Sequence, residues 1–587
     1  MNNETDRGHH IEKPWLKFYG DIPEFVDIPE LTMYEILRET ALQYPNKTVL
    51  QYLGAKMSYK RYLSMIDRCA GSLTAYGIKA GDSVILSMPN IPNTLMLFYA
   101  LNKIGARIVM THPLYSSSEL AHILKETDSV WCVTVDMFYD RFKDILRSDQ
   151  KLLITKISDF LPPSKKTLFK ITKGMRSKIP ADSRVIYWKD FLKESTGESA
   201  PYKRLIEPRD GAVVLFSGGT TDMPKGILLS SYNFNALSKI MGPFAKFGKD
   251  DSVIAILPVF HGFGLGLCVH TIACAGGTFI LEPKFGTKIY INSLRKYKPT
   301  FMAGVPTLFE AMLRDKNFKK VRFDHMKAIY SGGDSLSGEL KKRFDAQILA
   351  QGGAIELAEG YGLTETVTGC VLTPPGLYRK DAIGIPMPNM LVKVVDMETK
   401  MPLPYGEIGE ICVAGPTLMI EYINSPEDTE NAVRTDENGT RWLYTGDIGY
   451  MDEDGYLYFK SRAKRMLKVS GVNVYPMQIE QILEAHELVF RACVVGVPDD
   501  YQMTSVKAYI VLEDPALATD ETKQILLKYC RKHLIKWSVP RAIEFCDELP
   551  TTLVGKVEYS KLENSRITDA DIALSDSTDN ADSADAQ

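Results

Sequence analysis

Between residues 30 and 460, short apolar runs rich in β-branched residues alternate with stretches of helical periodicity. Four of these runs are predicted as buried strands: GAVVLFS (211–217), SVIAILP (252–258), GTFILEP (277–283) and MKAIYSGG (326–333). The segments PTLFEAMLRD (306–315) and SGELKKRFDAQIL (337–349) are predicted as helices, the first with Pro306 in its opening turn. This alternation is typical of parallel sheets covered by helices. We therefore expect an α/β fold with mostly parallel, helix-covered sheets.

Near residue 460 the pattern changes to that of a smaller α+β domain of about a hundred residues. It contains the strand-like segments GYLYFKSR, VKAYIVLE and RAIEFCDELP and the helical segments PMQIEQILEAHELV and KQILLKYCRKHL. Beyond residue 563 the chain is rich in Asp, Ser and Ala and has no aromatic residue, which predicts disorder. The expected parts are an N-terminal extension (1–29), a large domain (30–462), a small C-terminal domain (463–563) and a disordered acidic tail (564–587).

Length, charge and cysteine use exclude several classes of protein. A chain of 587 residues is too long for one compact core. Its formal net charge of −3 argues against nucleic acid as the main partner, because that binding needs a broad basic surface. The nine cysteines include no CxxC pair, and the N-terminal stretch MNNETDRGHHIEKPW has no apolar leader. We therefore expect a reduced, cytoplasmic protein without a zinc site.

Two segments leave a membrane interpretation open. The run 252–281 has no Asp, Glu, Lys or Arg and is long enough to span a bilayer, which takes ~20 apolar residues. Because Pro258, His261 and several glycines interrupt this run, we favour a buried strand–loop–helix unit over a membrane span. Between residues 165 and 184, seven Lys/Arg and one Asp are interleaved with apolar residues. This segment is interpreted as a solvated loop, or alternatively as a patch in peripheral contact with anionic lipid at the inner face of the membrane.

The segment FSGGTTDMPKGILL (216–229) has the composition of a phosphate-binding loop. Its adjacent glycines let backbone N–H groups approach an anion, its threonines add hydroxyl donors, and Lys225 adds a positive charge. A Walker loop has its lysine directly after a glycine, whereas here Pro224 precedes Lys225 and Gly226 follows it. The Walker interpretation therefore fails, and a glycine-rich surface turn remains the alternative. The candidate phosphate-binding residues are Ser217, Gly218, Gly219, Thr220, Thr221 and Lys225.

Three further motifs add candidate groups for a nucleotide site. In LAEGYGLTETVTG, Glu365 stands beside Thr364, which pairs a magnesium carboxylate with a phosphate donor. Asp447 lies in the tight turn of YTGDIG, where a carboxylate can bind a ribose diol, and Arg462 follows fifteen residues later. Lys556 follows a glycine in TTLVGKVEY. Each motif is weak alone, but their order and spacing together are specific.

Together these motifs resemble those of the adenylate-forming superfamily, which includes acyl-CoA synthetases, peptide-synthetase adenylation domains and firefly-type luciferases. The resemblance extends from about residue 30 to residue 563. Within the superfamily, THPLYSSSELAHIL, SGGTTDMPKG, LPVFHGFG, GVPTLFEAML, EGYGLTET and VSGVNVYPMQIE resemble bacterial long-chain fatty acid–CoA ligases most closely. The resemblance implies a large N-terminal adenylation domain, a small mobile C-terminal lid, ATP with Mg²⁺, and CoA as co-substrate.

The resemblance also implies two half-reactions and a role for each matching residue. A fatty acid carboxylate attacks the α-phosphate of ATP to give an acyl-adenylate, and the thiolate of CoA then displaces AMP. Catalytic roles would fall to Lys556, Thr364, Glu365 and Lys468, with Glu365 also binding Mg²⁺. ATP and AMP would contact Ser217, Gly218, Gly219, Thr220, Thr221, Lys225, Gly360, Tyr361, Gly362, Thr364, Asp447 and Arg462. The lid would turn about Lys464, CoA would pass Lys468, Ser470 and Gly471, and the acyl chain would contact His261, Gly304, Val305, Gly332, Gly333 and Asp334.

Three residues depart from the family pattern. Asp222 and Ser461 stand where relatives commonly have glycine, and Ser231 stands where many have histidine. The two serines are expected to be tolerated. A carboxylate near the ATP phosphates should repel them by ~1 kcal/mol if solvated at contact distance. The sequence therefore predicts that Asp222→Gly lowers the Michaelis constant for ATP, and an unchanged or higher constant would contradict the repulsion.

Other functions stay open at the level of sequence. An acyl-AMP ligase, an aryl or medium-chain acid–CoA ligase and a non-catalytic nucleotide- or acyl-binding homologue share most of these motifs, and the apolar run keeps an integral transporter as a further alternative. The sequence does not set the chain length of the acid, because a pocket discriminates one methylene by only ~1–3 kcal/mol. It also leaves a homodimer open.

Overall fold

The computed structural model describes residues 12–162, 179–195, 202–216, 224–499, 503–551 and 557–563. The chain divides into two compact units. The first unit contains Met1–Gly219, Met223–Val392 and Val413–Leu443, and the second contains Thr220–Asp222, Lys393–Cys412 and Tyr444–Gln587.

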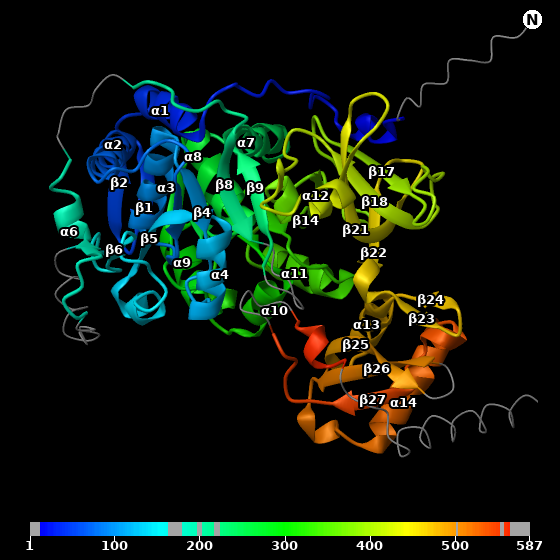
Figure 1. The fold of residues 1–587 in the computed structure, drawn as a ribbon. Helices are drawn as coiled ribbons and strands as arrows, with labels where there is room; N and C mark the ends of the chain where they lie inside the picture. Colours follow the sequence, from blue (N-terminus) through cyan, green and yellow to red (C-terminus); the bar gives the residue numbers. More distant parts are fainter. Residues whose placement is uncertain are drawn as a thin grey trace, which may run out of the picture. The chain divides into compact units, whose positions relative to one another are not determined.

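Two large sheets form the frame of the first unit (Figure 1). The nine-stranded sheet is ordered β16 (Ile385–Pro386), β15 (Val371–Leu372), β14 (Leu357–Tyr361), β13 (Ala328–Ser331), β12 (Phe301–Gly304), β10 (Ser252–Ala255), β11 (Thr278–Leu281), β1 (Thr48–Tyr52) and β2 (Ala55–Ser58). The eight-stranded sheet is ordered β19 (Glu421–Tyr422), β9 (Gly226–Ser230), β8 (Gly211–Phe216), β4 (Arg107–Met110), β3 (Ser83–Leu86), β5 (Ser129–Val135), β6 (Lys151–Thr155) and β7 (Val185–Tyr187).

The central strands of both sheets are parallel, and antiparallel pairs occur only near the ends of each sheet. The runs predicted as strands are confirmed as β8, β10, β11 and β13, and the α/β fold class is confirmed with them. Parallel strands require long crossovers, and helices provide them here.

Among its described residues, the first unit contains the helices α1 (Met33–Gln43), α2 (Tyr59–Ala75), α3 (Pro92–Ile104), α4 (Ser117–Glu126), α6 (Trp188–Phe191), α7 (Ser231–Ala245), α8 (Ile272–Cys274), α9 (Thr287–Tyr297), α10 (Pro306–Arg314), α11 (Gly338–Ala350) and α12 (Pro426–Ala432). Local sequence explains where several of them begin. The predicted helix at 306–315 starts with Pro306, whose missing N–H costs nothing in a first turn. The predicted helix at 337–349 starts after Ser337, whose hydroxyl accepts a hydrogen bond from Leu340 N.

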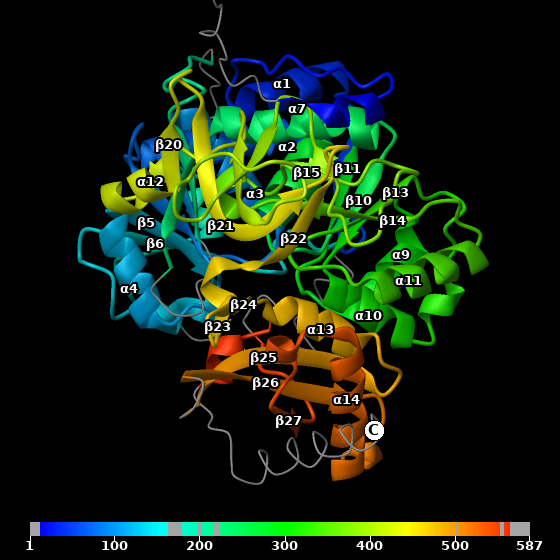
Figure 2. The same cartoon turned by 90° about the vertical axis from the view of Figure 1, so that its right-hand side faces the viewer.

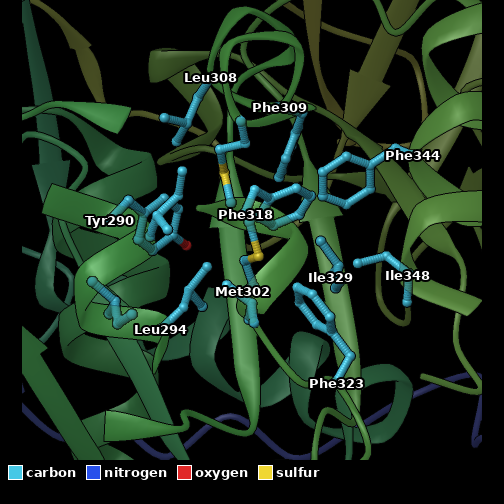
Figure 3. Packing of buried hydrophobic residues seen from close by; sticks show 14 of the residues in the cluster. Tyr290, Leu294, Met302, Leu308, Phe309, Phe318, Phe323, Ile329, Phe344 and Ile348 are labelled. Atoms are coloured by element: carbon cyan, nitrogen blue, oxygen red, sulfur yellow. The ribbon is translucent and has the colours of Figure 1, made fainter. Parts of the chain in front are cut away.

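One hydrophobic core packs α9, α10 and α11 against the nine-stranded sheet (Figure 3). Met302 from β12 and Ile329 from β13 are fully buried beneath a group of phenylalanines. The rings of Phe309 and Phe344 lie 4.9 Å apart in an edge-to-face arrangement. Each fully buried side chain of this kind contributes about 1.5–3 kcal/mol. The core therefore holds the carboxyl ends of β12 and β13 in place.

The apolar run at 252–281 forms buried secondary structure, as predicted. It contains β10, a turn, a π-helix at Phe263–Thr271, the short α8, and β11. Over the part of the chain that the structure describes, no helix is long and apolar enough to cross a membrane.

A further sheet of five strands contains β17 (Leu391–Val395), β18 (Gly409–Ala414), β21 (Arg441–Met451) and β20 (Val433–Thr435), with β22 (Leu457–Arg462) paired to β21. Toward the C-terminus, β25 (Val489–Asp499), β26 (Met503–Leu512) and β27 (Ala542–Phe545) form a small sheet (Figure 2). The helices α13 (Pro476–Glu484) and α14 (Asp520–His533) share a core with it. These elements confirm the small α+β region predicted after residue 460.

Candidate functional site

The carboxyl ends of β12, β13 and β14 form one edge of the nine-stranded sheet. Gly304 is the register partner of Ser331, and Ser331 is the partner of Glu359. Ligands in open α/β sheets bind beyond this edge. Five predicted residues lie at or just beyond it: Gly304, Val305, Gly332, Gly333 and Gly360.

Packing separates the glycines of this edge into two groups. A β-carbon on Gly304 would lie 2.9 Å from the Phe309 ring, so α10 already fills that direction. A β-carbon on Gly332 would instead meet Gly360 O at 3.3 Å and the Phe263 ring at 3.4 Å. The sequence did not single out Phe263, although it stands in the motif LPVFHGFG beside His261. The ring of Phe263 thus borders the predicted acyl-side residues.

The connection between β14 and β15 carries the predicted metal-binding and phosphate-binding residues. Cys370 N donates to Tyr361 O over 3.0 Å, which closes the loop at its base. Inside it, Thr364–Thr366 form a 3₁₀ turn. The chain then folds back so tightly that a β-carbon on Gly362 would lie 1.9 Å from Thr368 O. Only glycine therefore fits at residue 362.

Glu365 and Lys225 contact the same segment of chain. Tyr422 Oη donates to Glu365 Oε1 over 2.7 Å, and Met419 N donates to Glu365 O over 2.7 Å. Lys225 Nζ lies 2.8 Å from Asp428 Oδ1 and 5.7 Å from the centre of the Tyr422 ring. The strand β19 brings this segment to the site, because Tyr422 is paired with Ile227 in β9. The candidate phosphate lysine and the candidate metal carboxylate are thus brought together at Tyr422, which the sequence did not predict.

His261, Asp334 and Glu359 lie around the same sheet edge. The ring of His261 lies 5.4 Å from that of Phe260, and His261 N donates to Pro258 O. Asp334 is exposed and accepts a hydrogen bond from Ser335 N. Leu336 N donates to Glu359 Oε1 over 3.0 Å. Burial raises the pKa of the Glu359 carboxyl to about 8. Its polar position in the strand-like LAEGYG was the signal that could have identified it.

In the second unit, Asp447 and Arg462 are neighbours on paired strands. They are register partners on β21 and β22, and Arg462 Nε lies 3.2 Å from Asp447 Oδ1. The Asp447 side chain is only 1 % exposed, whereas that of Arg462 is 56 % exposed. The two predicted nucleotide contacts therefore share one location.

The predicted hinge and the predicted CoA-side residues follow Arg462 directly. Lys464 is exposed, and the next residue, Arg465, lies 2.6 Å from Glu480 Oε1. Lys468 is exposed on β23 (Leu467–Val469), which pairs with β24 (Val472–Val474). Ser470 and Gly471 join these strands with φ values of 49° and 82°. Positive φ at both central residues is typical of a tight type I′ hairpin turn.

Several predicted residues lie outside the described part of the chain: Ser217, Gly218, Gly219, Thr220, Thr221, Lys556, Asp222, the tail at 564–587 and most of the basic segment 165–184. Two of the departures from the family pattern are described. Ser231 is buried and accepts a hydrogen bond from Asn102 Nδ2 over 2.9 Å. Ser461 is buried, and its hydroxyl donates to Arg462 O over 3.2 Å. Both hydroxyls therefore have hydrogen-bond partners.

Comparison with known proteins places the chain in a family. Residues 37–423 match the model of the AMP-binding enzyme family, and residues 478–556 match the AMP-binding enzyme C-terminal domain. A long-chain-fatty-acid–CoA ligase of Bacillus subtilis (strain 168) is 33% identical over 562 residues, which cover 94% of this chain and 98% of the relative. A probable 4-coumarate–CoA ligase 3 of Dictyostelium discoideum is 28% identical, over 93% of this chain and 97% of the relative.

A solved structure has the same fold. The anthranilate CoA ligase AuaEII, in complex with anthranoyl-AMP, superposes with a TM-score of 0.79 at 22% identity, covering 93% of this chain and 98% of that one. Since the family model spans more than half of the sequence, this chain belongs to the AMP-binding enzyme family, the adenylate-forming enzymes whose motifs it carries.

Proposed function

We propose that the protein is an AMP-forming ligase that converts a long-chain fatty acid, ATP and CoA into acyl-CoA, AMP and pyrophosphate. The main support for this proposal is that Lys225 and Glu365 both lie beside Tyr422. It gives one site a cation for phosphate and a carboxylate for a metal ion. The preference for a long-chain acid rests on the 33% identity to the Bacillus subtilis ligase, against 28% to the coumarate ligase.

In the first half-reaction, a carboxylate oxygen attacks the α-phosphorus of ATP and pyrophosphate leaves. Both reactants are anions, so fixed positive charge and hydrogen-bond donors supply most of the catalysis. Lys225 and Thr364 would contact the phosphates, and Lys556 would bridge the carboxylate and the α-phosphate. Lys225 Nζ lies 2.8 Å from Asp428 Oδ1, and a phosphate would replace that carboxylate.

The residues around Glu365 fit Mg²⁺. Mg²⁺ is usually held by one or two protein carboxylates together with substrate phosphates and water. Among the described residues, no three His, Cys, Asp or Glu side chains gather to form a metal site of their own. Glu365 would hold the ion, its carboxylate oriented by the Tyr422 hydroxyl. The bound ion would neutralise charge on the phosphates.

The nucleoside part of ATP would be held by two sets of residues. Gly360, Tyr361 and Gly362, at the end of β14, would flank the adenine. Asp447 would accept hydrogen bonds from the ribose hydroxyls, and Arg462 would keep that carboxylate oriented. Ser217, Gly218, Gly219, Thr220 and Thr221 would surround the phosphates.

In the second half-reaction, the thiolate of CoA attacks the acyl carbonyl and AMP leaves with the bridging oxygen. The small domain, with its boundary after Arg462, would rotate about Lys464 to expose Lys468, Ser470 and Gly471 to CoA. Support comes from the position of Lys464, an exposed residue between two arginines that are each held by a carboxylate. Local rotation at one free residue is how hinges absorb such motion.

The acyl chain would lie beside Gly332 and Gly333, with His261, Val305 and Asp334 around it. Phe263 would also contact the acyl chain, because its apolar ring lies against Gly332. Gly304 would act indirectly, because α10 fills the space in front of it.

A cytoplasmic location is supported by the nine cysteines, all of which are free thiols. Peripheral membrane contact through 165–184 and a homodimer stay predictions.

The test is a substrate panel. The protein is incubated with Mg·ATP, CoA and acids from octanoate to oleate together with benzoate and 4-coumarate, and AMP, pyrophosphate and thioester are measured by mass spectrometry. We expect AMP and thioester in equal amounts, with long-chain acids preferred. Preference for an aryl acid would support the coumarate-type alternative. Pyrophosphate release without thioester would indicate an acyl-AMP ligase, and absence of acid-dependent release would indicate a binding protein.

A further inference from the structure

Val367 has a backbone conformation that valine rarely adopts. Its φ is 62° and its ψ is −55°, and Thr368 N donates to Thr366 O over 2.7 Å. A hydrogen bond between residues two apart at these angles defines the positive-φ γ-turn, which is rare and strained. Positive φ is especially unfavourable for a β-branched residue. Such a conformation persists only where the surrounding structure holds it.

The segment that follows His261 holds Val367 on one side. Val367 is fully buried, and a β-carbon on Gly262 would lie 1.4 Å from its carbonyl oxygen. A β-carbon on Gly266 would lie 3.0 Å from Val367 Cγ1. Gly262 directly precedes the π-helix Phe263–Thr271. The start of that helix therefore lies against the Val367 peptide group, and only glycine fits at residue 262.

The turn with the nucleotide-side residues lies on the other side of Val367. Val367 N donates to Thr364 O over 3.1 Å, so the valine ends the 3₁₀ turn that contains Glu365. The same turn is tied to the rest of the unit through Met419 N and the Tyr422 hydroxyl. A rotation of the Val367 peptide group would consequently move the Thr364–Thr366 turn or break its last hydrogen bond.

We propose that Val367 is a positioning residue that couples the acid-side segment, His261 to Gly266, to the nucleotide-side turn, Thr364 to Thr366. This inference rests on the proposed function, which supplies the acid and the nucleotide. An acid that packs against Phe263 stabilises the segment in contact with Val367, and through the γ-turn it stabilises Thr364 and Glu365 in their ATP-binding position. Coupling between two binding sites is reciprocal, so ATP must tighten acid binding by the same factor.

Two substitutions of Val367 test the coupling. In Val367→Gly the γ-turn is no longer strained, and the peptide group can leave Gly262 without cost. Val367→Ala keeps a β-carbon and therefore a barrier to positive φ. The matched control is Val109→Ala, which removes the same methyl groups from a fully buried valine of β4. The dissociation constant of α,β-methylene-ATP is measured by calorimetry with and without a long-chain acid, together with melting temperature and the rate of each half-reaction.

For the wild-type protein we expect the acid to tighten binding of the ATP analogue. In Val367→Gly this effect should disappear. The rate of pyrophosphate release should fall on the order of 10²-fold, because a small misplacement of reacting groups lowers a rate by that much. Thioester formation from added acyl-adenylate should be unchanged, and the melting temperature should fall no more than in the control.

Three outcomes would overturn the proposal. In the first, the acid does not change the affinity of the wild-type protein for the ATP analogue. In the second, Val367→Gly keeps the wild-type coupling, and in the third, the rates of both half-reactions of Val367→Gly fall together with its melting temperature. Failure of the proposed function is a separate outcome, because a wild-type protein that releases no pyrophosphate with any acid can still be tested for coupled binding.

Discussion

Tyr422 places one hydroxyl and one ring between two charged groups. Its hydroxyl donates to the Glu365 carboxylate and its ring lies below the Lys225 ammonium, while β19 and β9 fix its backbone. Groups that orient a metal-binding carboxylate typically change metal affinity or activity by about 10–100-fold when removed. Tyr422→Phe should therefore raise the Mg²⁺ concentration needed for half-maximal pyrophosphate release by about tenfold or more, with little change in melting temperature. The control is Tyr297→Phe, which removes a hydroxyl that accepts a hydrogen bond from Lys296. Equal Mg²⁺ curves for both variants would contradict this role of Tyr422.

Glu359 makes stability depend on pH. Burial, assisted by the charges of Asp334 and Asp381, raises the pKa of its carboxyl to about 8, although the Leu336 N–H and Lys341 oppose the shift. The folded protein thus keeps a proton that the unfolded chain releases above its ordinary pKa of 4.5. The contribution of Glu359 to stability therefore falls as pH rises from about 4.5 to 8, because at this carboxyl the unfolded state then binds fewer protons than the folded state.

Glu359→Gln should remove this dependence, since glutamine resembles the protonated acid. The melting temperature of the variant, compared with that of the wild type, should rise progressively between pH 5 and pH 9. The exposed Glu437→Gln serves as the control. Parallel melting curves at all pH values for wild type and Glu359→Gln would show that this carboxyl is not protonated in the folded state.

Motifs predicted some residues of the site and could not predict others. Lys225, Glu365 and Asp447 stand in short segments whose composition matches their chemistry. Tyr422 lies in a segment without such a pattern, and Val367 lies in the motif of Glu365 but has no side-chain chemistry that marks it. Their importance depends on contacts between distant parts of the chain, such as the pairing of β19 with β9 and the approach of Gly262. Backbone conformations such as that of Val367 cost on the order of 1–3 kcal/mol, and no pattern in the sequence predicts this strain.

Among the secondary-structure elements, the hairpin β23–β24 allows a direct test of the predicted CoA-side residues. Gly471 has a φ of 82°, and a side chain there would be strained although no atom lies within 4 Å. Gly471→Val should cost about 1–2 kcal/mol. It should slow thioester formation from added acyl-adenylate while pyrophosphate release is retained. Ser470→Asn should keep the turn, because Asn-Gly is favoured in type I′ turns. Thioester formation by Gly471→Val at the wild-type rate would exclude a role of the hairpin in CoA binding.

Element types followed from sequence more directly than their irregularities did. The strands β8, β10, β11 and β13 and the helices α10 and α11 were predicted because each has apolar periodicity and clear end signals. A helix was expected within 252–281, but the π geometry at Phe263–Thr271 was not, since its sequence FGLGLCVHT is mostly apolar and has no helical face. Its geometry depends on Gly264, where a β-carbon would lie 2.2 Å from Pro258 O. Packing, which periodicity does not report, decides such cases.

For the whole molecule, the hinge prediction at Lys464 connects structure to the two half-reactions. Proline fixes φ near −65° and removes the N–H, so Lys464→Pro should restrict rotation at this residue. We expect acid-dependent pyrophosphate release to remain near the wild-type rate while thioester formation falls at least tenfold. Lys464→Ala should retain both rates. If the proline variant forms thioester normally, the domain does not turn at this residue.

In the proposed reaction, a carboxylate is activated by its attack on the α-phosphorus of ATP. A fatty acid labelled with ¹⁸O in both carboxylate oxygens, supplied together with ATP and CoA, tests this attack. One labelled oxygen bonds to the α-phosphorus, and cleavage of the acyl–oxygen bond by CoA leaves it on AMP. We expect one ¹⁸O in each AMP, one in each thioester and none in pyrophosphate. Label in inorganic phosphate with formation of ADP would contradict it.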